Sequence, residues 1–223
     1  MQVTATEVQR IYQKRFSEAD KARKAQIWRV IVSDFFQKWV RPSDVVLDLG
    51  CGYGEFLNYL KADRRIGVDL NPDSETHLAT GVEFFKHSVC NLPFLDDNSV
   101  DVVFTSNLME HLPDKRHVEQ MMLEAKRVLK PGGHFVMMGP NIRVIHGRYW
   151  DFWDHVVPLS DLCLVEGLEN HGYEVVDAYK QFLPYTTRSR LPSAPWIVRL
   201  YLKLWPAWRI FGGQFLIRAR KPV

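Results

Sequence analysis

The sequence has few cysteines, little net charge and no long apolar run. Its three cysteines, Cys51, Cys90 and Cys163, match neither a disulfide framework nor a metal site. It has 29 basic and 26 acidic residues, and a net charge of +3 is too balanced for a nucleic-acid-binding surface across the whole molecule. We see no signal-peptide pattern and no apolar segment of membrane-spanning length, so we expect a cytoplasmic protein in a reducing compartment.

Hydrophobic residues make up 46% of the 223 residues, enough to build the core of one domain. Helical periodicity over 5–16 and 21–40 predicts N-terminal helices, the second ending before Pro42. Strand and helix patterns then alternate, which predicts an α/β fold with a doubly wound parallel sheet. The expected strands are 45–49, 65–69, 82–86, 100–105, 133–138, 173–180 and 214–220, and the expected helices are 54–61, 72–79 and 114–129.

A glycine-rich turn follows the first of these strands. Gly50, Gly52 and Gly54 allow positive φ and let a ligand approach the backbone closely. Asp69 ends the next predicted strand, about 20 residues further on, where a ribose-binding acid belongs. We therefore expect a ligand that contains a nucleoside. Glu55 stands at the third glycine position of a dinucleotide motif and would repel a diphosphate, which disfavours NAD.

The stretch from Asp48 to Gly54 resembles the first motif of the class I S-adenosylmethionine-dependent methyltransferases. Further segments resemble the small-molecule branch of that family, in the expected order: 90–94, 98–104, 110–114 and 127–133. The resemblance implies a Rossmann-like seven-stranded sheet of order 3-2-1-4-5-7-6 with the last strand antiparallel. It also implies S-adenosylmethionine as cofactor and S-adenosylhomocysteine as product.

The same resemblance suggests how the chain is organised. Residues 1–42 would form an N-terminal helical cap, and residues 43–223 the methyltransferase domain. Insertions near 140–160 and 182–211 would bind the acceptor.

The resemblance also implies which residues contact the cofactor. Asp48 and the backbone of Gly50 and Gly52 would hold the methionine portion, and Asp69 would accept hydrogen bonds from the ribose hydroxyls. Ser88 stands where family members often carry an acid for the adenine amino group, and its hydroxyl can still accept one hydrogen bond. The remaining expected contacts are Leu70 beside the adenine, Asn107 beside the transferable methyl group, and Cys51 and Val89.

Methylation of a hydroxyl requires a proton acceptor, for which a histidine is suited near neutral pH. His155 and His111 lie on segments expected over the cofactor site. We expect His155 to act first, because Asp151 and Asp154 are close enough in sequence to orient its ring. Glu110 adjoins His111 but would point away from it on a helix. In the alternative interpretation His111 is a helix-start residue that only packs or caps. We expect no metal in the site.

Aromatic residues concentrate in two loops after the fifth predicted strand. Residues 149–155 interleave aromatics with acids, which indicates either a wall that stacks on an acceptor or a satellite core beneath a long loop. In 182–192, arginines beside hydroxyls could clamp a phosphate or carboxylate, or the loop could simply be solvated. The predicted acceptor-binding residues are Asn141, Arg143, Tyr149, Trp150, Asp151, Asp154, Tyr185 and Arg188.

Residues 196–211 are basic and rich in aromatics. This composition is typical of a helix on a membrane surface, and equally of a helix whose broad apolar face covers the edge of a sheet. Pro206 interrupts the helical pattern, which favours the second interpretation.

The resemblance implies methyl transfer to a small or lipid-linked acceptor. The chain looks similar to bacterial methyltransferases of surface-glycan or secondary-metabolite assembly, so a hydroxyl of a sugar or glycan precursor is the expected target. A quinone or polyketide-like ring is the alternative acceptor. A non-catalytic regulatory or assembly protein that binds S-adenosylmethionine is the alternative of another class. An N-P-P-Y/F motif and a long basic region are both absent, which disfavours nucleic acid and protein acceptors.

Overall fold

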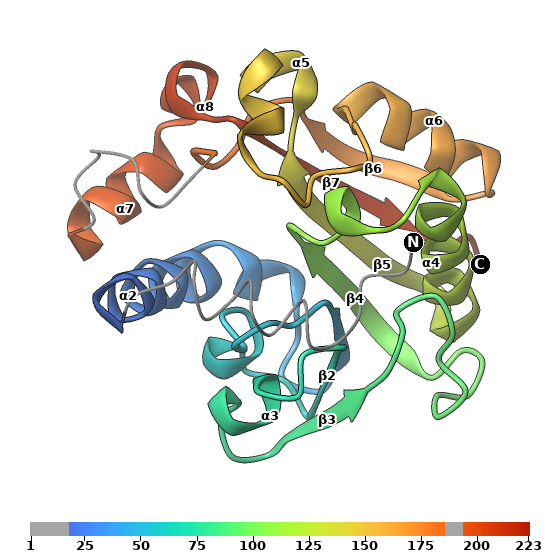
Figure 1. The fold of residues 1–223 in the computed structure, drawn as a ribbon. Coiled ribbons are helices and arrows are strands. Elements are labelled where there is room, and N and C mark those ends of the chain that lie inside the picture. Colours follow the sequence, from blue (N-terminus) through green and yellow to red (C-terminus); the bar gives the residue numbers. More distant parts are fainter. Residues whose placement is uncertain (1–17, 186–193) are drawn as a thin grey trace.

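The computed structural model describes residues 18–185 and 194–223, which form a seven-stranded sheet with helices on both faces (Figure 1). The strand order is β3-β2-β1-β4-β5-β7-β6, and β7 runs antiparallel to both of its neighbours. This confirms the predicted fold class. The strands are β1 (Val45–Leu49), β2 (Arg64–Asp69), β3 (Val82–Lys86), β4 (Val100–Ser106), β5 (Leu129–Pro140), β6 (Glu174–Tyr179) and β7 (Gln214–Arg220).

The central strands bury side chains on both faces, as parallel strands covered by helices do. Along β1, Leu47 and Leu49 belong to one hydrophobic cluster, whereas Val46 belongs to another on the opposite face. This alternation follows from the two-residue period of a strand. The sheet therefore separates two cores, each covered by its own layer of helices.

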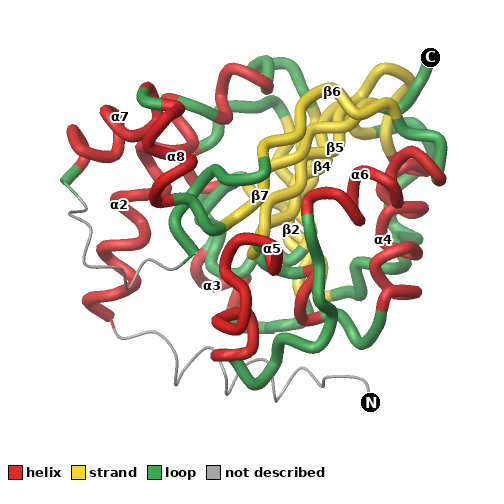
Figure 2. The backbone as a smooth tube through the Cα atoms, turned by 90° about the horizontal axis from the view of Figure 1, so that it is seen from above, coloured by secondary structure: helices red, strands yellow, loops and turns green. Residues whose placement is uncertain are grey.

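Figure 2 shows the two layers on either side of the sheet, with α4 and α6 on one side and α2, α7 and α8 on the other. The α-helices are α2 (Glu18–Asp34), α3 (Ser74–His77), α4 (Lys115–Val128), α5 (Ile142–Ile145), α6 (Asp161–Asn170), α7 (Pro195–Lys203) and α8 (Trp205–Phe211). Short 3₁₀ helices are η1 (Phe36–Trp39), η2 (Leu57–Tyr59), η3 (Met109–His111) and η4 (His146–Asp151). None of the described helices is long and apolar enough to cross a membrane.

The helix predicted over 54–61 is wrong, since the structure has only the 3₁₀ turn η2 there. Asn58 accounts for the difference, because its side chain donates to the carbonyl oxygens of Tyr53 and His77 and accepts from the amide of Ala79. A side chain that bonds to backbone in this way competes with helix formation. The same contact to Ala79 accompanies the early end of α3, where Leu78 is already extended.

The remaining predicted elements lie close to the observed ones. Strand β5 begins at Leu129, earlier than expected, because the segment after α4 joins the sheet through a register shift opposite Val100 and Val102. The stretch 196–211 forms two helices, with Pro206 in the first turn of α8, where a proline is tolerated. The helix predicted over 5–16, and with it much of the expected 1–42 cap, lies outside the described residues.

Candidate active site

The loop after β1 is tied closely to the end of β2. The amides of Gly50 and Cys51 donate to the carbonyl oxygen of Val68 at 2.8 and 3.1 Å. Gly50 has φ +73°, and a Cβ at that position would lie 2.8 Å from a methyl carbon of Leu108. Glycine is therefore required here both for its conformation and for the close approach of neighbouring chain.

Asp69, the acid at the end of β2, binds this loop. One carboxylate oxygen accepts from the amide of Gly52 at 2.8 Å, and the other accepts from the amide of Asn71 at 2.8 Å. Each carboxylate oxygen has a second lone pair, so the group can still accept hydrogen bonds from a ligand. Asp69 thus shapes the loop and is available to bind.

Three carboxylates gather around the glycine loop. Burial raises the pKa of Asp48 well above its usual value, and the charges of Glu55 and Asp69 raise it further. Burial also raises the pKa of Asp69, although the amides of Asn71 and Gly52 counteract part of that shift. Glu55 is paired with Lys24, with 2.7 Å between Nζ and Oε1. A ligand that carries positive charge would relieve the repulsion among these groups.

The other predicted cofactor residues occupy the same edge of the sheet. Leu70 follows β2 and is 39% exposed, and Ser88 and Val89 follow β3, with Ser88 exposed and Val89 buried. Asn107 follows β4 with φ +52°, and its backbone N–H donates to the carbonyl oxygen of Met138 at 3.0 Å. Burial raises the pKa of the Cys51 thiol, so this residue packs as a neutral group. Parallel strands end at one edge, which explains why these residues meet there.

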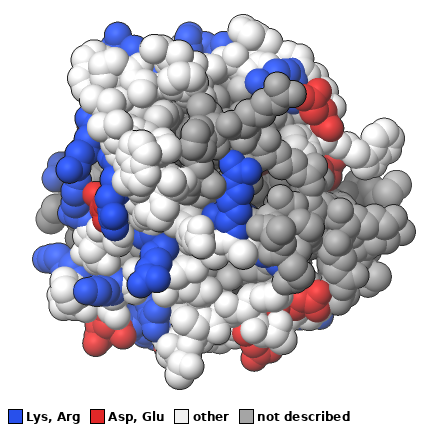
Figure 3. All heavy atoms as spheres, turned by 90° about the vertical axis from the view of Figure 1, so that its left-hand side faces the viewer, with Lys and Arg blue, Asp and Glu red and all other residues white. Residues whose placement is uncertain are grey.

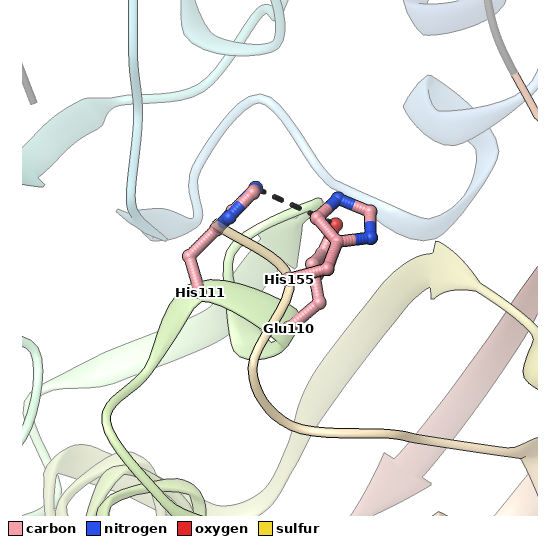
Figure 4. A group of neighbouring side chains, drawn as sticks. All are labelled: Glu110, His111 and His155. Carbon is pink, nitrogen blue, oxygen red and sulfur yellow. Dashed lines mark ion pairs between the residues drawn. The ribbon is translucent and has the colours of Figure 1, made fainter. Parts of the chain in front are cut away.

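A second group of titratable side chains lies at the ends of β4 and β5. Figure 4 shows Glu110, His111 and His155 pointing toward one another, with a dashed line for the ion pair between His111 Nε2 and Glu110 Oε1 at 3.9 Å. The two imidazole rings have centroids 4.8 Å apart. Glu110 and His155 are buried, at 2% and 7% exposure. The structure therefore brings both predicted histidines into one cluster.

Asp154 belongs to the same cluster through His111. Its carboxylate lies 3.2 Å from Nδ1 of His111, and its backbone carbonyl oxygen lies 2.9 Å from the same nitrogen. The sequence-based expectation that only His155 has a carboxylate to orient its ring is wrong, because Asp154 contacts His111. His111 sits in the 3₁₀ turn η3, not in an α-helix, and the loop of Asp154 folds back onto it.

Backbone contacts hold the two contributing segments together. The amides of Val156 and Val157 donate to the carbonyl oxygen of Glu110 at 2.9 and 3.2 Å. A Cβ added to Gly139, near the end of β5, would lie 3.7 Å from Glu110 Oε2. The cluster is thus fixed beside the ends of β4, which pairs with β1, and of β5, which pairs with β4.

The protonation of His111 reflects these contacts. Burial by itself lowers the pKa of His111, but the hydrogen bond to Asp154 and the charges of Glu110 and Asp154 outweigh burial, and the net pKa is raised. Glu110, His111 and His155 offer nitrogen and oxygen atoms within 4.8 Å of one another, a spacing that could also admit a divalent cation. A chelator would stop the activity if the cluster binds a cation, and would have no effect if the histidines only accept a proton.

Aromatic residues of the predicted acceptor wall surround His155 unequally. Phe152 stacks on its ring at 5.0 Å, and Tyr149 meets it edge-on at 5.0 Å. Tyr149 is fully buried and donates its hydroxyl to the carbonyl oxygen of Val157, so it belongs to the core. Trp150 and Asp151 are exposed. The loop therefore contains a small core around Tyr149, and its role as a wall that stacks on an acceptor stays a prediction.

The polar groups of three other predicted acceptor residues are engaged within the protein. Asn141 is fully buried, caps α5 and donates to Asp161 at 2.8 Å, and Arg143 forms an ion pair with Asp161 at 2.9 Å. The hydroxyl of Tyr185 donates to the carbonyl oxygen of Arg148 at 3.2 Å. Arg188 lies outside the described residues. The structure gives Asn141 and Arg143 a structural role, and their contact with an acceptor stays a prediction.

Sequence reasoning missed two residues of this region. Glu110 was dismissed as pointing away, although an acid next to a histidine just after a strand was a usable signal. Asp161, buried at 7% exposure, binds Asn141 and Arg143, which lie 20 and 18 positions away. No local pattern marks Asp161, since its partners are adjacent only in the folded chain.

Comparison with known proteins agrees with this geometry. Residues 47–137, which include the glycine loop and β4, match the family model described as a methyltransferase domain. Residues 47–137 of this chain are therefore similar to an S-adenosylmethionine-dependent methyltransferase domain. The cofactor of such a domain is S-adenosylmethionine. The buried carboxylates at the glycine loop can accept hydrogen bonds from its ribose hydroxyls and attract its positive charge.

Two relatives are similar over part of this chain. A protein of Mycolicibacterium smegmatis named "Probable S-adenosylmethionine-dependent methyltransferase" is 37% identical over 144 residues, which are 61% of this chain and 54% of that protein. The phthiotriol/phenolphthiotriol dimycocerosates methyltransferase of Mycobacterium tuberculosis is 34% identical over 157 residues, or 62% and 56% of the two chains. The chain thus spans about half the length of these relatives.

A solved structure supports the fold over most of the chain. The S-adenosylmethionine-dependent methyltransferase of Thermotoga maritima superimposes with a TM-score of 0.68 at 19% identity and covers 96% of this chain and 99% of that one. At this identity the similarity concerns the fold alone.

Proposed function

We propose that this protein transfers a methyl group from S-adenosylmethionine to a small or lipid-linked acceptor, and that the target is a hydroxyl of a sugar or glycan precursor. The observation that carries the proposal is the contact of His111 with Asp154, beside His155, at the strand ends next to the glycine loop. A site that only bound the cofactor would need no oriented imidazole there.

The cofactor side of the proposed site uses the carboxyl ends of β1 and β2. Asp48 and the backbone of Gly50 and Gly52 would hold the methionine portion, and Asp69 would bind the ribose. Leu70, Ser88 and Val89 would flank the adenine, with Cys51 packed beneath the loop and Asn107 toward the acceptor. When bound, S-adenosylmethionine supplies a methyl group already activated on a sulfonium.

The acceptor side must take a proton as the hydroxyl is methylated. The Nδ1–H of His111 donates to Asp154, which holds the tautomer whose Nε2 carries the free lone pair. Neutral Nε2 is then the atom that accepts the proton, and Asp154 and Glu110 stabilise the resulting imidazolium. His155, in ring contact with His111, is the second candidate for this role.

The acceptor surface is proposed to come from the two insertions near 140–160 and 182–211, with residues 1–42 as a helical cap. Trp150 and Trp153 are 52% and 98% exposed, and exposed aromatic faces suit the stacking of a sugar ring or a hydrocarbon chain. Asp151, Asp154 and Tyr185 lie in these segments as polar groups for recognition. The mycobacterial relative whose name refers to phthiotriol dimycocerosates supports a lipid-linked acceptor.

A quinone or polyketide-like ring is the second candidate acceptor. The stacking of Phe152 on His155, with Tyr185 at 5.8 Å from Phe152, is the observation that favours it, because a flat ring could extend this aromatic row. A planar phenol would use the same base as a sugar hydroxyl. The two candidates therefore differ in the product and share the chemistry of the site.

The test is to incubate the protein with a cell extract and S-adenosylmethionine carrying a ¹³C- and radiolabelled methyl group. We expect label in a lipid or sugar fraction, with the carbon resonance of an O-methyl group. Label in a phenolic product would support the ring acceptor, and an N-methyl or C-methyl resonance would overturn the hydroxyl assignment. Cofactor binding without transfer to any fraction would indicate a non-catalytic binding protein.

A further inference from the structure

Helices α7 and α8 present an unusually apolar exposed surface, which we call the α7–α8 face. Its large hydrophobic residues have exposed fractions between 47% and 72%, and they are Trp196, Leu200, Leu204, Trp205, Ile210 and Phe211. Isolated exposed hydrophobic residues are ordinary, but six within 16 residues on two successive helices are typical of an interaction site.

The opposite sides of both helices are anchored in the protein. Leu202 and Trp208 are buried at 9% and 8% exposure in the core beneath them. The indole of Trp208 donates to the carbonyl oxygen of Tyr201 at 2.9 Å. The hydroxyl of Tyr201 in turn donates to the backbone carbonyl oxygen of Phe182. The α7–α8 face is therefore held outward by the fold, and the sheet-covering interpretation accounts only for the inner side.

The charge on this face has one sign. Residues 195–211 contain Arg199, Lys203 and Arg209 and no aspartate or glutamate. Arg199 forms an ion pair with Asp34 of α2 at 2.9 Å, whereas Lys203 is exposed and Arg209 lies 4.7 Å over the ring of Trp205. Figure 3 views the side of the molecule where α2 and α7 lie, and lysines and arginines are more widespread on it than acids.

Along α7, basic and apolar residues share the exposed side. Trp196, Arg199, Leu200 and Lys203 follow the three- and four-residue spacing of one helical face. A helix that lies in a membrane interface has this arrangement, because tryptophan and leucine enter the acyl boundary while lysine and arginine extend their charged ends to the head groups. A protein partner would have to supply both a matching apolar surface and acids, whereas an anionic bilayer supplies both at once.

We propose that the α7–α8 face binds the surface of a membrane that contains anionic phospholipids. This deepens the proposed function, since such a contact would bring the acceptor insertion to a lipid-linked substrate, but the binding itself depends on neither cofactor nor acceptor. No described helix is suited to span the bilayer, so the contact is peripheral.

The test is co-sedimentation of the full chain with vesicles of phosphatidylglycerol and phosphatidylcholine, compared with vesicles of phosphatidylcholine alone. We expect binding to the anionic vesicles that weakens at high salt. The double variant Trp196→Ser with Trp205→Ser should bind at least about tenfold more weakly, because it removes two interfacial anchors. Lys203→Ala should weaken binding about fivefold, the effect of one basic residue near an anionic surface.

The matched control is Leu162→Ser with Leu123→Ser on α6 and α4, which removes exposed leucines from the other layer of the molecule. This control should bind vesicles like the parent. All variants should keep their melting temperature and their affinity for S-adenosylhomocysteine, so a folding defect is recognised separately.

Several outcomes would overturn the proposal. Equal binding to neutral and anionic vesicles, or equal losses in the α7–α8 and control variants, would contradict a specific anionic contact. No vesicle binding, with a concentration-dependent dimer that the double variant abolishes, would assign the face to a second copy of the chain. Because vesicle binding is measured without methyl transfer, its failure would leave the proposed activity intact.

Discussion

The two halves of the proposed site are built in different ways. At the ends of β1 and β2, the centre of the cofactor half comes from residues 48–71, and its acid Asp69 is held by the backbone amides of Gly52 and Asn71. At the ends of β4 and β5, the acceptor half joins His111 to Asp154, which is 43 positions away. The first half is a property of a local motif, whereas the second exists only after the long loops have folded.

This difference predicts that the two halves can be disabled separately. A change in the acceptor half should reduce turnover and leave cofactor affinity intact, and a change at the β2 acid should do the reverse. Variants in either half that reduce turnover and cofactor affinity together would contradict the division into a cofactor half and an acceptor half.

The largest effect is expected for His111→Ala, which removes the base. We expect kcat to fall by roughly 10²- to 10⁴-fold with unchanged affinity for S-adenosylhomocysteine. His155→Ala should cost less, and His117→Ala on α4 is the matched control with near-normal turnover. If His155→Ala is the more damaging change, the base is His155, as first expected from the sequence. If a chelator abolishes activity and magnesium restores it, the cluster binds a cation.

Asp69→Ala tests the cofactor half. We expect calorimetry to show cofactor affinity weakened by roughly 2–4 kcal/mol, since a charged acceptor for two hydroxyls is lost. Because Asp69 also bonds to the amides of Gly52 and Asn71, its melting temperature must be recorded in parallel. The exposed acid Asp96 provides the control variant Asp96→Ala, and unchanged affinity in Asp69→Ala would remove Asp69 from the site.

Ligand-induced stabilisation sharpens the assignment of the cofactor. S-adenosylmethionine and S-adenosylhomocysteine at about 100 times their Kd should stabilise the fold by about 2.7 kcal/mol, seen as a higher melting temperature. NAD should produce no shift, because Glu55 occupies the third glycine position of the dinucleotide motif and would repel the diphosphate. A shift with NAD and none with the sulfonium ligand would contradict the cofactor assignment.

The sequence predicts the cofactor half better than the acceptor half. Asp48, the glycines and Asp69 were predictable because the turn and the strand ends are determined by neighbouring residues. The sheet order came from the family resemblance. Which carboxylate orients which histidine was not predictable, because it depends on η3 being a 3₁₀ turn and on the loop of Asp154 returning to it. Asn58 likewise replaced a predicted helix through contacts 19 and 21 positions away.

Asp154→Asn should reduce kcat by an intermediate amount and should also change the pH dependence of the rate. The base must be neutral, so the parent rate should fall as pH decreases through the pKa of His111, which is raised above the usual 6.5. Loss of the Asp154 charge removes one cause of that rise, and the acid limb should move to lower pH. We expect kcat to drop about tenfold, the loss of a charge-assisted hydrogen bond of ~1.5 kcal/mol. Asp151→Asn, an exposed neighbour, should leave the pH profile in place.

The smallest effect is expected for Tyr149→Phe. Its buried hydroxyl donates to the carbonyl oxygen of Val157, and its loss should cost about 1 kcal/mol of unfolding free energy in a denaturant titration. Turnover per folded molecule should be nearly unchanged if Tyr149 belongs to the core. A large rise in KM for the acceptor would instead return Tyr149 to the acceptor site.

The most direct measurement is transfer of a radiolabelled methyl group from saturating S-adenosylmethionine into a cell extract, by the parent and by His111→Ala at equal bound cofactor. We predict label in a lipid or sugar fraction with the parent, and at least about a 100-fold lower rate with the variant. Equal rates for the two proteins would contradict the assignment of His111. No transfer by either protein, despite full cofactor occupancy, would contradict the account of an enzyme with separate cofactor and acceptor halves.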